Sequence, residues 1–202
     1  MQPLDPQPVP TTCVASVQMA PAIGEVAANV ARSIELAEEA AGQGARLVVL
    51  PELANTGYMF ASREEAYALA EPVPEGPSSR AWIALAERLG IYLVAGIAER
   101  CGDRLYNSAL IAGPQGYIGT YRKLHLWGDE NLYFEAGDLG LPVFHTELGR
   151  LGVAICSTSI IARAAEKATA GASAARGFGA WVVHTASKKA SVSDPNSKAS
   201  RM

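Results

Sequence analysis

The sequence predicts an α/β domain, because strand-like and helix-like segments alternate along the first half of the chain. Residues 47–50 form a continuous apolar run, which is typical of a strand buried on both faces of a sheet. The segment before that run places Val26, Val30 and Ile34 at helical spacing. A strand, a helix and a second strand in this order predict a right-handed βαβ unit in a parallel or mixed sheet.

The composition is that of one globular domain with a sizeable core. The chain has 202 residues, of which 49% are hydrophobic and 18% charged. The formal net charge of −3 argues against nucleic acid or an anionic membrane as a partner. No apolar run approaches the ~20 residues that span a bilayer. The three cysteines fit no metal-site spacing, and free thiols favour a cytoplasmic location.

Turn and capping residues set the limits of the elements in the first half. The first helix should stop at Gly42, because glycine favours helix ends, and the next strand should end at Pro51, which has no N–H to donate. Ser62 and Glu65 resemble a capping box that starts a short helix. The expected order is a disordered lead-in 1–11, strand 13–19, helix 26–42, strand 46–51, a short helix after 62, a helix ending at 90, and strand 91–97.

The second half predicts a hairpin and then less regular elements. The apolar runs 105–112 and 117–123 flank the turn Gly113-Pro-Gln-Gly116, which indicates two antiparallel strands. The expected elements are a polar connection 99–104, the hairpin 105–123, a loop over the site 126–137, strands 143–144 and 151–155, a helix 162–175 and a strand 180–184. Residues 12–186 would form the single domain, and residues 187–202 a polar tail.

Three of the expected strands end in a side chain that can perform acid–base or nucleophilic chemistry. Glu52 follows one strand, Lys123 ends the hairpin, and Cys156 follows the strand 151–155. A carboxylate at the end of a buried strand is costly unless it is paired or used. Singly, each residue also fits an ordinary role: an outward-facing Glu, a surface Lys and a thiol packed in the core.

With these residues the chain resembles the nitrilase, or carbon–nitrogen hydrolase, superfamily. The resemblance covers residues 12–156, and each of its motifs follows an expected strand. The three motifs, in their order in the family, are Pro51-Glu52, Arg122-Lys123-Leu-His125 and Gly152-Val-Ala-Ile-Cys156. The fold that this resemblance implies is a four-layer αββα sandwich.

The resemblance also implies a mechanism and a substrate class. A Glu-Lys-Cys triad would consist of Glu52 as proton carrier, Lys123 as oxyanion stabiliser and Cys156 as nucleophile, with no metal or organic cofactor. The stretch 51–58 is more similar to the amidase and carbamoylase branches than to nitrile hydrolases. A small amide or N-carbamoyl compound is therefore the expected substrate. A homo-oligomer is the expected assembly for a separate reason, because an incomplete C-terminal part would leave an apolar sheet edge or face uncovered.

Further residues are expected at the site by the same resemblance. Glu130 precedes an aromatic pair and a Gly-Asp, as in the family, so Glu130 rather than Glu135 is expected to support the triad. Asn107 is a second supporting candidate, although a polar residue of a hairpin is an equally good interpretation. The aromatic residues expected at the substrate pocket are Tyr58, Trp127 and Tyr133.

After Cys156 the sequence departs from the family pattern. Ser157 stands where the family has an aromatic residue, and the segment that follows is rich in Ala, Ser and Lys. Truncation or a shifted reading frame would explain this, and an uncovered sheet would then promote self-association. The alternatives left open are an inactive remnant that acts as a binding protein, nitrile hydrolysis, and a Cys-His enzyme that uses His125, His145 or His184.

Overall fold

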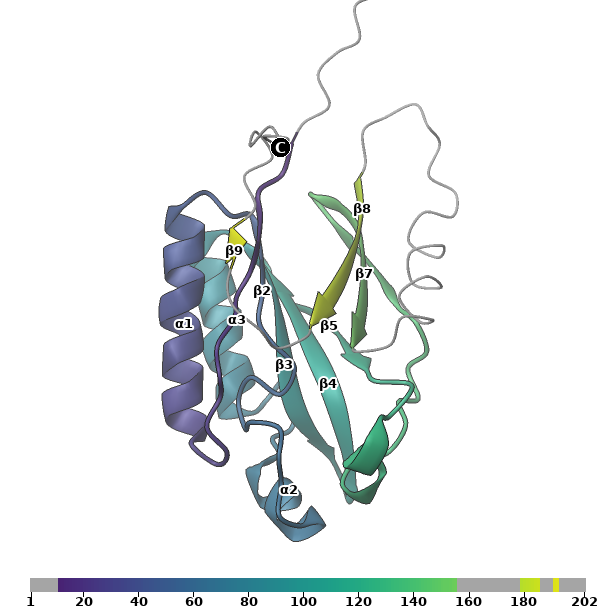
Figure 1. Cartoon of the computed structure of the whole chain (residues 1–202). Helices are drawn as coiled ribbons and strands as arrows, with labels where there is room; N and C mark the ends of the chain where they lie inside the picture. Colours follow the sequence, from purple (N-terminus) through teal and green to yellow (C-terminus); the bar gives the residue numbers. More distant parts are fainter. Residues whose placement is uncertain (1–10, 156–178, 186–190, 193–202) are drawn as a thin grey trace, which may run out of the picture.

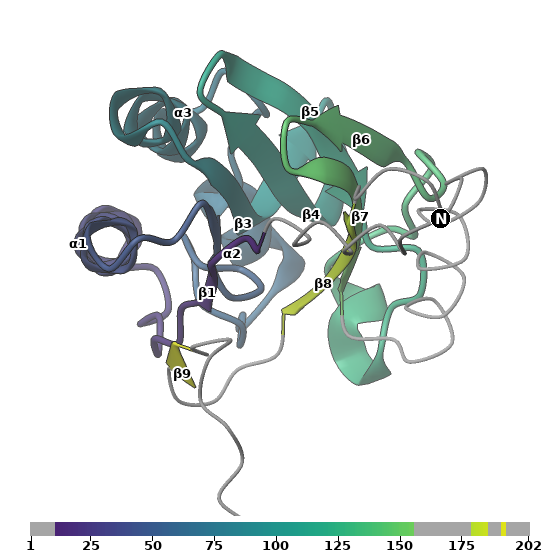
Figure 2. The same ribbon diagram turned by 90° about the horizontal axis from the view of Figure 1, so that it is seen from above.

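The computed structural model describes residues 11–155 and the backbone of residues 179–185 and 191–192. They form a layered α/β structure, which confirms the predicted fold class (Figure 1). Seen from above, helices α1 (Val26–Gly42) and α3 (Pro77–Leu89) lie on one side of a six-stranded sheet, and a three-stranded sheet lies on the other (Figure 2). These are three of the four expected layers, and the expected helix 162–175 lies outside the described residues.

The six-stranded sheet is mixed, as the order of strands and helices predicted. Strands β1, β2 and β3 pair in parallel, whereas β3, β4 and β5 form an antiparallel meander. The strand order is β5-β4-β3-β2-β1-β9. The strands are β1 (Val14–Ser16), β2 (Leu47–Val49), β3 (Tyr92–Cys101), β4 (Arg104–Gly113), β5 (Gly116–Arg122) and β9 (Ser191–Val192).

Both faces of this sheet are buried, which explains the continuous apolar run of β2. Val48 and Leu50 pack in the core beneath α1 and α3, whereas Leu47 and Val49 pack in the core that faces the second sheet. Successive side chains of a strand point to opposite faces, so a strand between two cores must be apolar at every position. The six-stranded sheet is therefore packed between two hydrophobic cores, one on each face.

The second sheet consists of β6 (Val143–Thr146), β7 (Gly149–Ile155) and β8 (Gly179–Thr185). β6 pairs with β7 antiparallel, and β7 pairs with β8 in parallel. Leu151, Val153 and Ile155 of β7 pack against the first sheet. The expected strands 143–144, 151–155 and 180–184 are therefore present, each somewhat longer than its apolar run.

One expected element was wrong. Residues 99–104 were expected to form a polar connection, but β3 and β4 continue through them to a tight turn at Gly102 and Asp103. Glu99 is only 3% exposed. Its charge is tolerated there because Ser108 donates to it at 2.5 Å and Arg122 forms an ion pair with it.

The ends of the helices follow the expected capping residues. Ser62 accepts a hydrogen bond from the Glu65 N–H at 3.2 Å and caps α2 (Arg63–Leu69). Gly90 ends α3 with a φ of 64°, in the left-handed region that glycine adopts readily. None of the helices among the described residues is both long and apolar enough to cross a bilayer.

Candidate active site

The candidate site lies where the segments after β2 and β5 meet the middle of β4. Lys123 directly follows β5, and its Nζ lies 2.7 Å from Glu52 Oε1 and 2.7 Å from Glu130 Oε1. The Lys123 side chain is 1% exposed, and the two carboxylates are 10% and 5% exposed. Glu52 therefore joins Lys123, 71 residues further along the chain, and Glu130 in one buried cluster of charges.

Glu52 is positioned by a close approach of two backbones. A Cβ atom on Gly96 of β3 would lie 2.3 Å from the Pro51 carbonyl oxygen and 2.6 Å from Glu52 Cα, so only glycine fits there. The Ala54 N–H then donates to the Gly96 carbonyl at 2.9 Å. Leu53 has a φ of 49°, an unusual conformation for a residue with a side chain.

Lys123 is held through its backbone on both sides. Its N–H donates to the Asn107 carbonyl at 2.8 Å, and its carbonyl accepts from the Gly137 N–H at 2.9 Å. A Cβ atom on Gly137 would lie 2.3 Å from the Arg122 carbonyl oxygen, so this glycine permits the contact. The position of the Lys123 ammonium is thus fixed by backbone contacts with β4 and with Gly137.

Asn107 connects the two carboxylates. Its Nδ2 donates to Glu52 Oε1 at 2.7 Å and lies 3.4 Å from Glu130 Oε1. Asn107, one of the two expected supporting residues, therefore lies in the cluster beside both carboxylates. Since Asn107 is 0% exposed, its amide N–H groups have carboxylate acceptors where no solvent reaches them.

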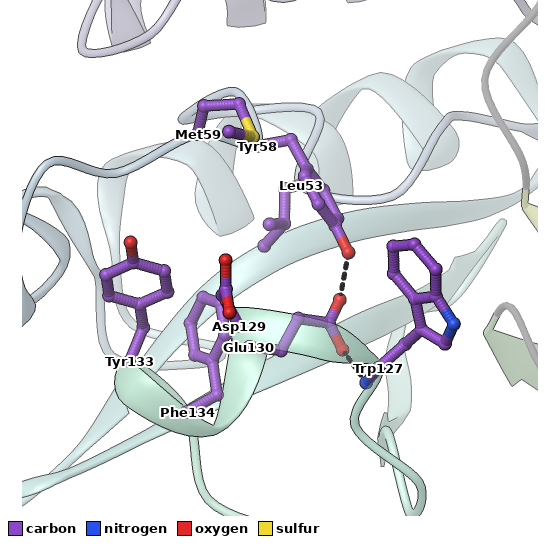
Figure 3. A pocket seen from close by; sticks show the side chains of 8 residues that line it. All are labelled: Leu53, Tyr58, Met59, Trp127, Asp129, Glu130, Tyr133 and Phe134. Carbon is purple, nitrogen blue, oxygen red and sulfur yellow. Dashed lines mark hydrogen bonds between the residues drawn. The ribbon is translucent and has the colours of Figure 1, made fainter.

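Glu130 belongs to η1 (Gly128–Leu132), a short 3-10 helix inside the expected loop. Its Oε2 accepts from the Trp127 N–H at 2.8 Å, and its Oε1 also accepts from the Tyr58 hydroxyl (Figure 3). Glu135, by contrast, lies 3.2 Å from Arg63 in a partly exposed ion pair. The structure thus places Glu130, and not Glu135, beside Lys123.

The cluster has distinctive electrostatics. Burial raises the pKa of the Glu52 carboxyl, although the Lys123 ammonium and the Asn107 amide oppose this. Burial alone would lower the pKa of Lys123, but the charges and hydrogen bonds of Glu52 and Glu130 outweigh it and raise that pKa. The arrangement therefore combines a permanently charged ammonium with a carboxyl group that accepts a proton more readily than usual.

The end of β7 lies close to this cluster. The Tyr121 hydroxyl accepts from the Leu124 N–H at 3.4 Å, and Tyr121 packs in the same core as Ile155. Burial raises the pKa of this hydroxyl, and the charge of Lys123 opposes the rise. Ile155 is the last residue of β7 and immediately precedes Cys156. Cys156 itself lies outside the described residues.

The histidines that a Cys-His enzyme would need are not brought to the cluster where the structure describes them. His125 and His145 are both exposed, and among the described residues neither forms a hydrogen bond or ion pair with Glu52 or Lys123. The side chain of His184 lies outside the described part of the chain. Within the described residues no group of three or more His, Cys, Asp or Glu side chains is placed to hold a metal ion.

A pocket of about 170 Å³ adjoins Glu130. Asp129, Glu130, Tyr133 and Phe134 project into it from η1 and the residues that follow (Figure 3). The remaining lining residues that the structure describes are Leu53, Tyr58, Met59 and Trp127. The three aromatic residues expected at a substrate pocket are all among them.

Sequence reasoning did not identify Leu53, Met59, Asp129 and Phe134 as pocket residues. Asp129 and Phe134 could have been found, because both lie in the aromatic and acidic stretch expected to cover the site. Leu53 could not, because its position depends on a backbone conformation that no local pattern predicts.

Comparisons with known proteins identify the family of this chain. The carbon–nitrogen hydrolase family model matches residues 13–175. A nitrilase of Pyrococcus abyssi (strain GE5 / Orsay) is 50% identical over 143 residues, which are 71% of this chain and 55% of that protein. An N-carbamoylputrescine amidase of Arabidopsis thaliana is 35% identical over 150 residues, which are 71% of this chain and 50% of that protein.

Solved structures show the same fold. The structure of Saccharomyces cerevisiae Nit3, a member of branch 10 of the nitrilase superfamily, has a TM-score of 0.67 and 27% sequence identity. That match covers 78% of this chain and 61% of Nit3. The chain spans about half the length of the curated relatives named above. The family match over residues 13–175 shows that this chain belongs to the carbon–nitrogen hydrolase family.

Proposed function

We propose that this protein hydrolyses the non-peptide C–N bond of small amides or N-carbamoyl compounds through a thioester on Cys156. One observation carries the proposal. The buried Lys123 ammonium lies 2.7 Å from each of two carboxylates, Glu52 and Glu130, near the strand end that precedes Cys156. A buried ion cluster of this kind is costly to form and is typical of a catalytic site.

In the first half-reaction Glu52 takes the proton from the Cys156 thiol, and the sulfur attacks the carbonyl carbon. A C–S bond forms, and the negative charge that develops on the carbonyl oxygen is stabilised by the Lys123 ammonium. Glu52 then delivers its proton to the leaving nitrogen, the C–N bond breaks, and ammonia or an amine departs. The acyl group remains on the sulfur.

In the second half-reaction Glu52 takes a proton from water, and the hydroxide attacks the thioester carbon. The C–S bond breaks, the acid is released, and the proton returns to the thiolate. Glu130 and Asn107 hold Lys123 and Glu52 in place through both steps. The raised pKa of Glu52 suits a group that must accept and return a proton twice.

The direct test is the mass of the intact protein after incubation with an activated amide or ester. We expect an acyl adduct that maps to Cys156 and is absent from Cys156→Ser. Glu52→Gln removes the proton carrier without changing shape, so acylation should slow by about 10²–10⁴-fold. A folded wild-type chain that forms no adduct would identify a binding protein that retains the fold without the activity.

Nitrile hydrolysis is the second candidate, because the Pyrococcus abyssi relative at 50% identity is described as a nitrilase. The same thiol can attack a nitrile carbon, and two waters then give an acid and ammonia. Ammonia release from a panel of nitriles, with none from amides or carbamoyl compounds, would favour this candidate over the first.

A further inference from the structure

Asp129 lines the pocket, but the proposed mechanism gives it no role. It lies in the first turn of η1, next to Glu130, and is exposed. Among the described residues its carboxylate forms no ion pair, and none of their side chains donates a hydrogen bond to it. A charged group that faces a pocket without a protein partner can pair with a ligand instead.

The other polar groups of the pocket already have protein partners. The Glu130 carboxylate accepts from Lys123 and from the Trp127 N–H, and the Tyr58 hydroxyl donates to it. The Tyr133 hydroxyl donates to the Phe60 carbonyl at 2.8 Å. Among the described lining, Asp129 is therefore the charged group best placed to select a ligand.

The charges around the pocket favour a cation. None of its described lining residues is Lys, Arg or His. The nearest buried cation, Lys123, is shared between Glu52 and Glu130. A substrate carboxylate would face Asp129 without a compensating charge, whereas an ammonium would be attracted.

Aromatic rings strengthen this preference. Tyr58, Trp127 and Tyr133 line the same pocket as Asp129, and the Trp127 side chain is 72% exposed. The faces of such rings attract cations through their quadrupole, and tryptophan does so most strongly. A carboxylate among aromatic rings is the combination that recognises organic ammonium groups.

We infer that the substrate carries a cationic amino group, held by Asp129 and the aromatic rings while the amide lies at Lys123. The placement of the amide at Lys123 rests on the proposed function. The preference for a cation rests on the pocket alone.

The test compares three primary amides of matched length that end in an ammonium, a methyl group or a carboxylate: the ω-amino amide of pentanoic acid, hexanamide and glutaramate. Their binding to the full-length Cys156→Ser protein is measured by NMR titration, so that no turnover interferes. We expect the ammonium compound to bind about tenfold more tightly than hexanamide, and glutaramate to bind more weakly than both.

Asp129→Asn should reduce the preference for ammonium over methyl to about twofold, because the aromatic rings alone remain. The matched control Asp103→Asn, in the exposed turn between β3 and β4, should leave the preference unchanged. The inference would be overturned if the three amides bound equally, if glutaramate bound most tightly, or if none of them bound. It would also be overturned if Asp129→Asn left the preference for ammonium over methyl unchanged. A wild-type chain that forms no acyl adduct, while Cys156→Ser still prefers the ammonium compound, would refute the proposed function and leave this inference standing.

Discussion

At the level of single residues, Glu52 has two neighbours that affect its charge. The Asn107 amide donates to Glu52 at 2.7 Å, and Glu130 contacts the same Lys123 ammonium that Glu52 contacts. Both neighbours act on the proton affinity of Glu52, but in opposite directions. The hydrogen bond from Asn107 lowers the pKa of Glu52, and the negative charge of Glu130 raises it. Burial, the larger influence, also raises it.

Opposite pH shifts are therefore expected from two substitutions. Asn107→Leu removes a donor to the Glu52 carboxylate, so the pKa of Glu52 should rise and the acid limb of the kcat/KM profile should move to higher pH. Glu130→Gln removes a negative charge, so the pKa should fall and the limb should move to lower pH. Rates of Cys156 acylation across pH provide the measurement. Shifts of the same sign in both variants would contradict the assignment of Glu52 as the base.

At the level of elements, Arg122 ties three strands together at the end that carries Lys123. Its Nε donates to Glu99 Oε2 of β3 at 3.0 Å, its guanidinium lies 4.0 Å from the centre of the Tyr106 ring of β4, and Asp138 accepts from it at 2.8 Å. The Arg122 and Glu99 side chains are 11% and 4% exposed. Buried ion pairs with several hydrogen bonds fix geometry rather than add stability.

Arg122→Met should lower the free energy of unfolding by about 3–5 kcal/mol, because it leaves the Glu99 charge buried and unpaired. The double variant Arg122→Met, Glu99→Gln should recover part of that loss. As a control, Arg32→Met breaks the exposed pair with Glu35 and should change stability by less than about 1 kcal/mol. Urea unfolding provides the measurement, and equal losses from the buried and exposed pairs would contradict this account.

At the level of the whole molecule, the position of β7, and with it the strand end before Cys156, depends on how the two sheets pack. Gly119 of β5 makes room for the Phe144 ring of β6, since a Cβ atom at Gly119 would lie 2.5 Å from that ring. Leu151 and Val153 of β7 fill the same core. Close packing between sheets therefore contributes to site geometry.

Gly119→Ala should destabilise the protein by about 1–3 kcal/mol through overpacking. Gly42→Ala is the matched control, because no atom lies within 4 Å of the added methyl group, and its stability should stay equal or rise slightly. Adding Phe144→Leu to Gly119→Ala should reduce the loss by making room for the methyl group. Thermal unfolding of the four proteins measures this, and equal stability of the two alanine variants would refute it.

The sequence by itself determined the elements and the order of the motifs. The helix that ends at Gly42, the buried run of β2, the hairpin and the strand 180–184 all follow from local pattern, because burial and capping act over neighbouring residues. The preference for Glu130 over Glu135 also came from a local motif. Only the tertiary structure decided which distant side chains meet.

The contacts of Tyr58 with Glu130, of Asn107 with Glu52 and of Arg122 with Glu99 join different elements. The Arg122–Glu99 pair depends on the pairing of β3, β4 and β5 in one sheet. The positions of Glu52 and Lys123 depend on the close backbone approaches at Gly96 and Gly137. Local pattern therefore identified residues able to perform the chemistry. Tertiary packing decided which of these residues meet at the buried Lys123 ammonium. Local sequence pattern does not report this, because the residues that meet belong to different elements.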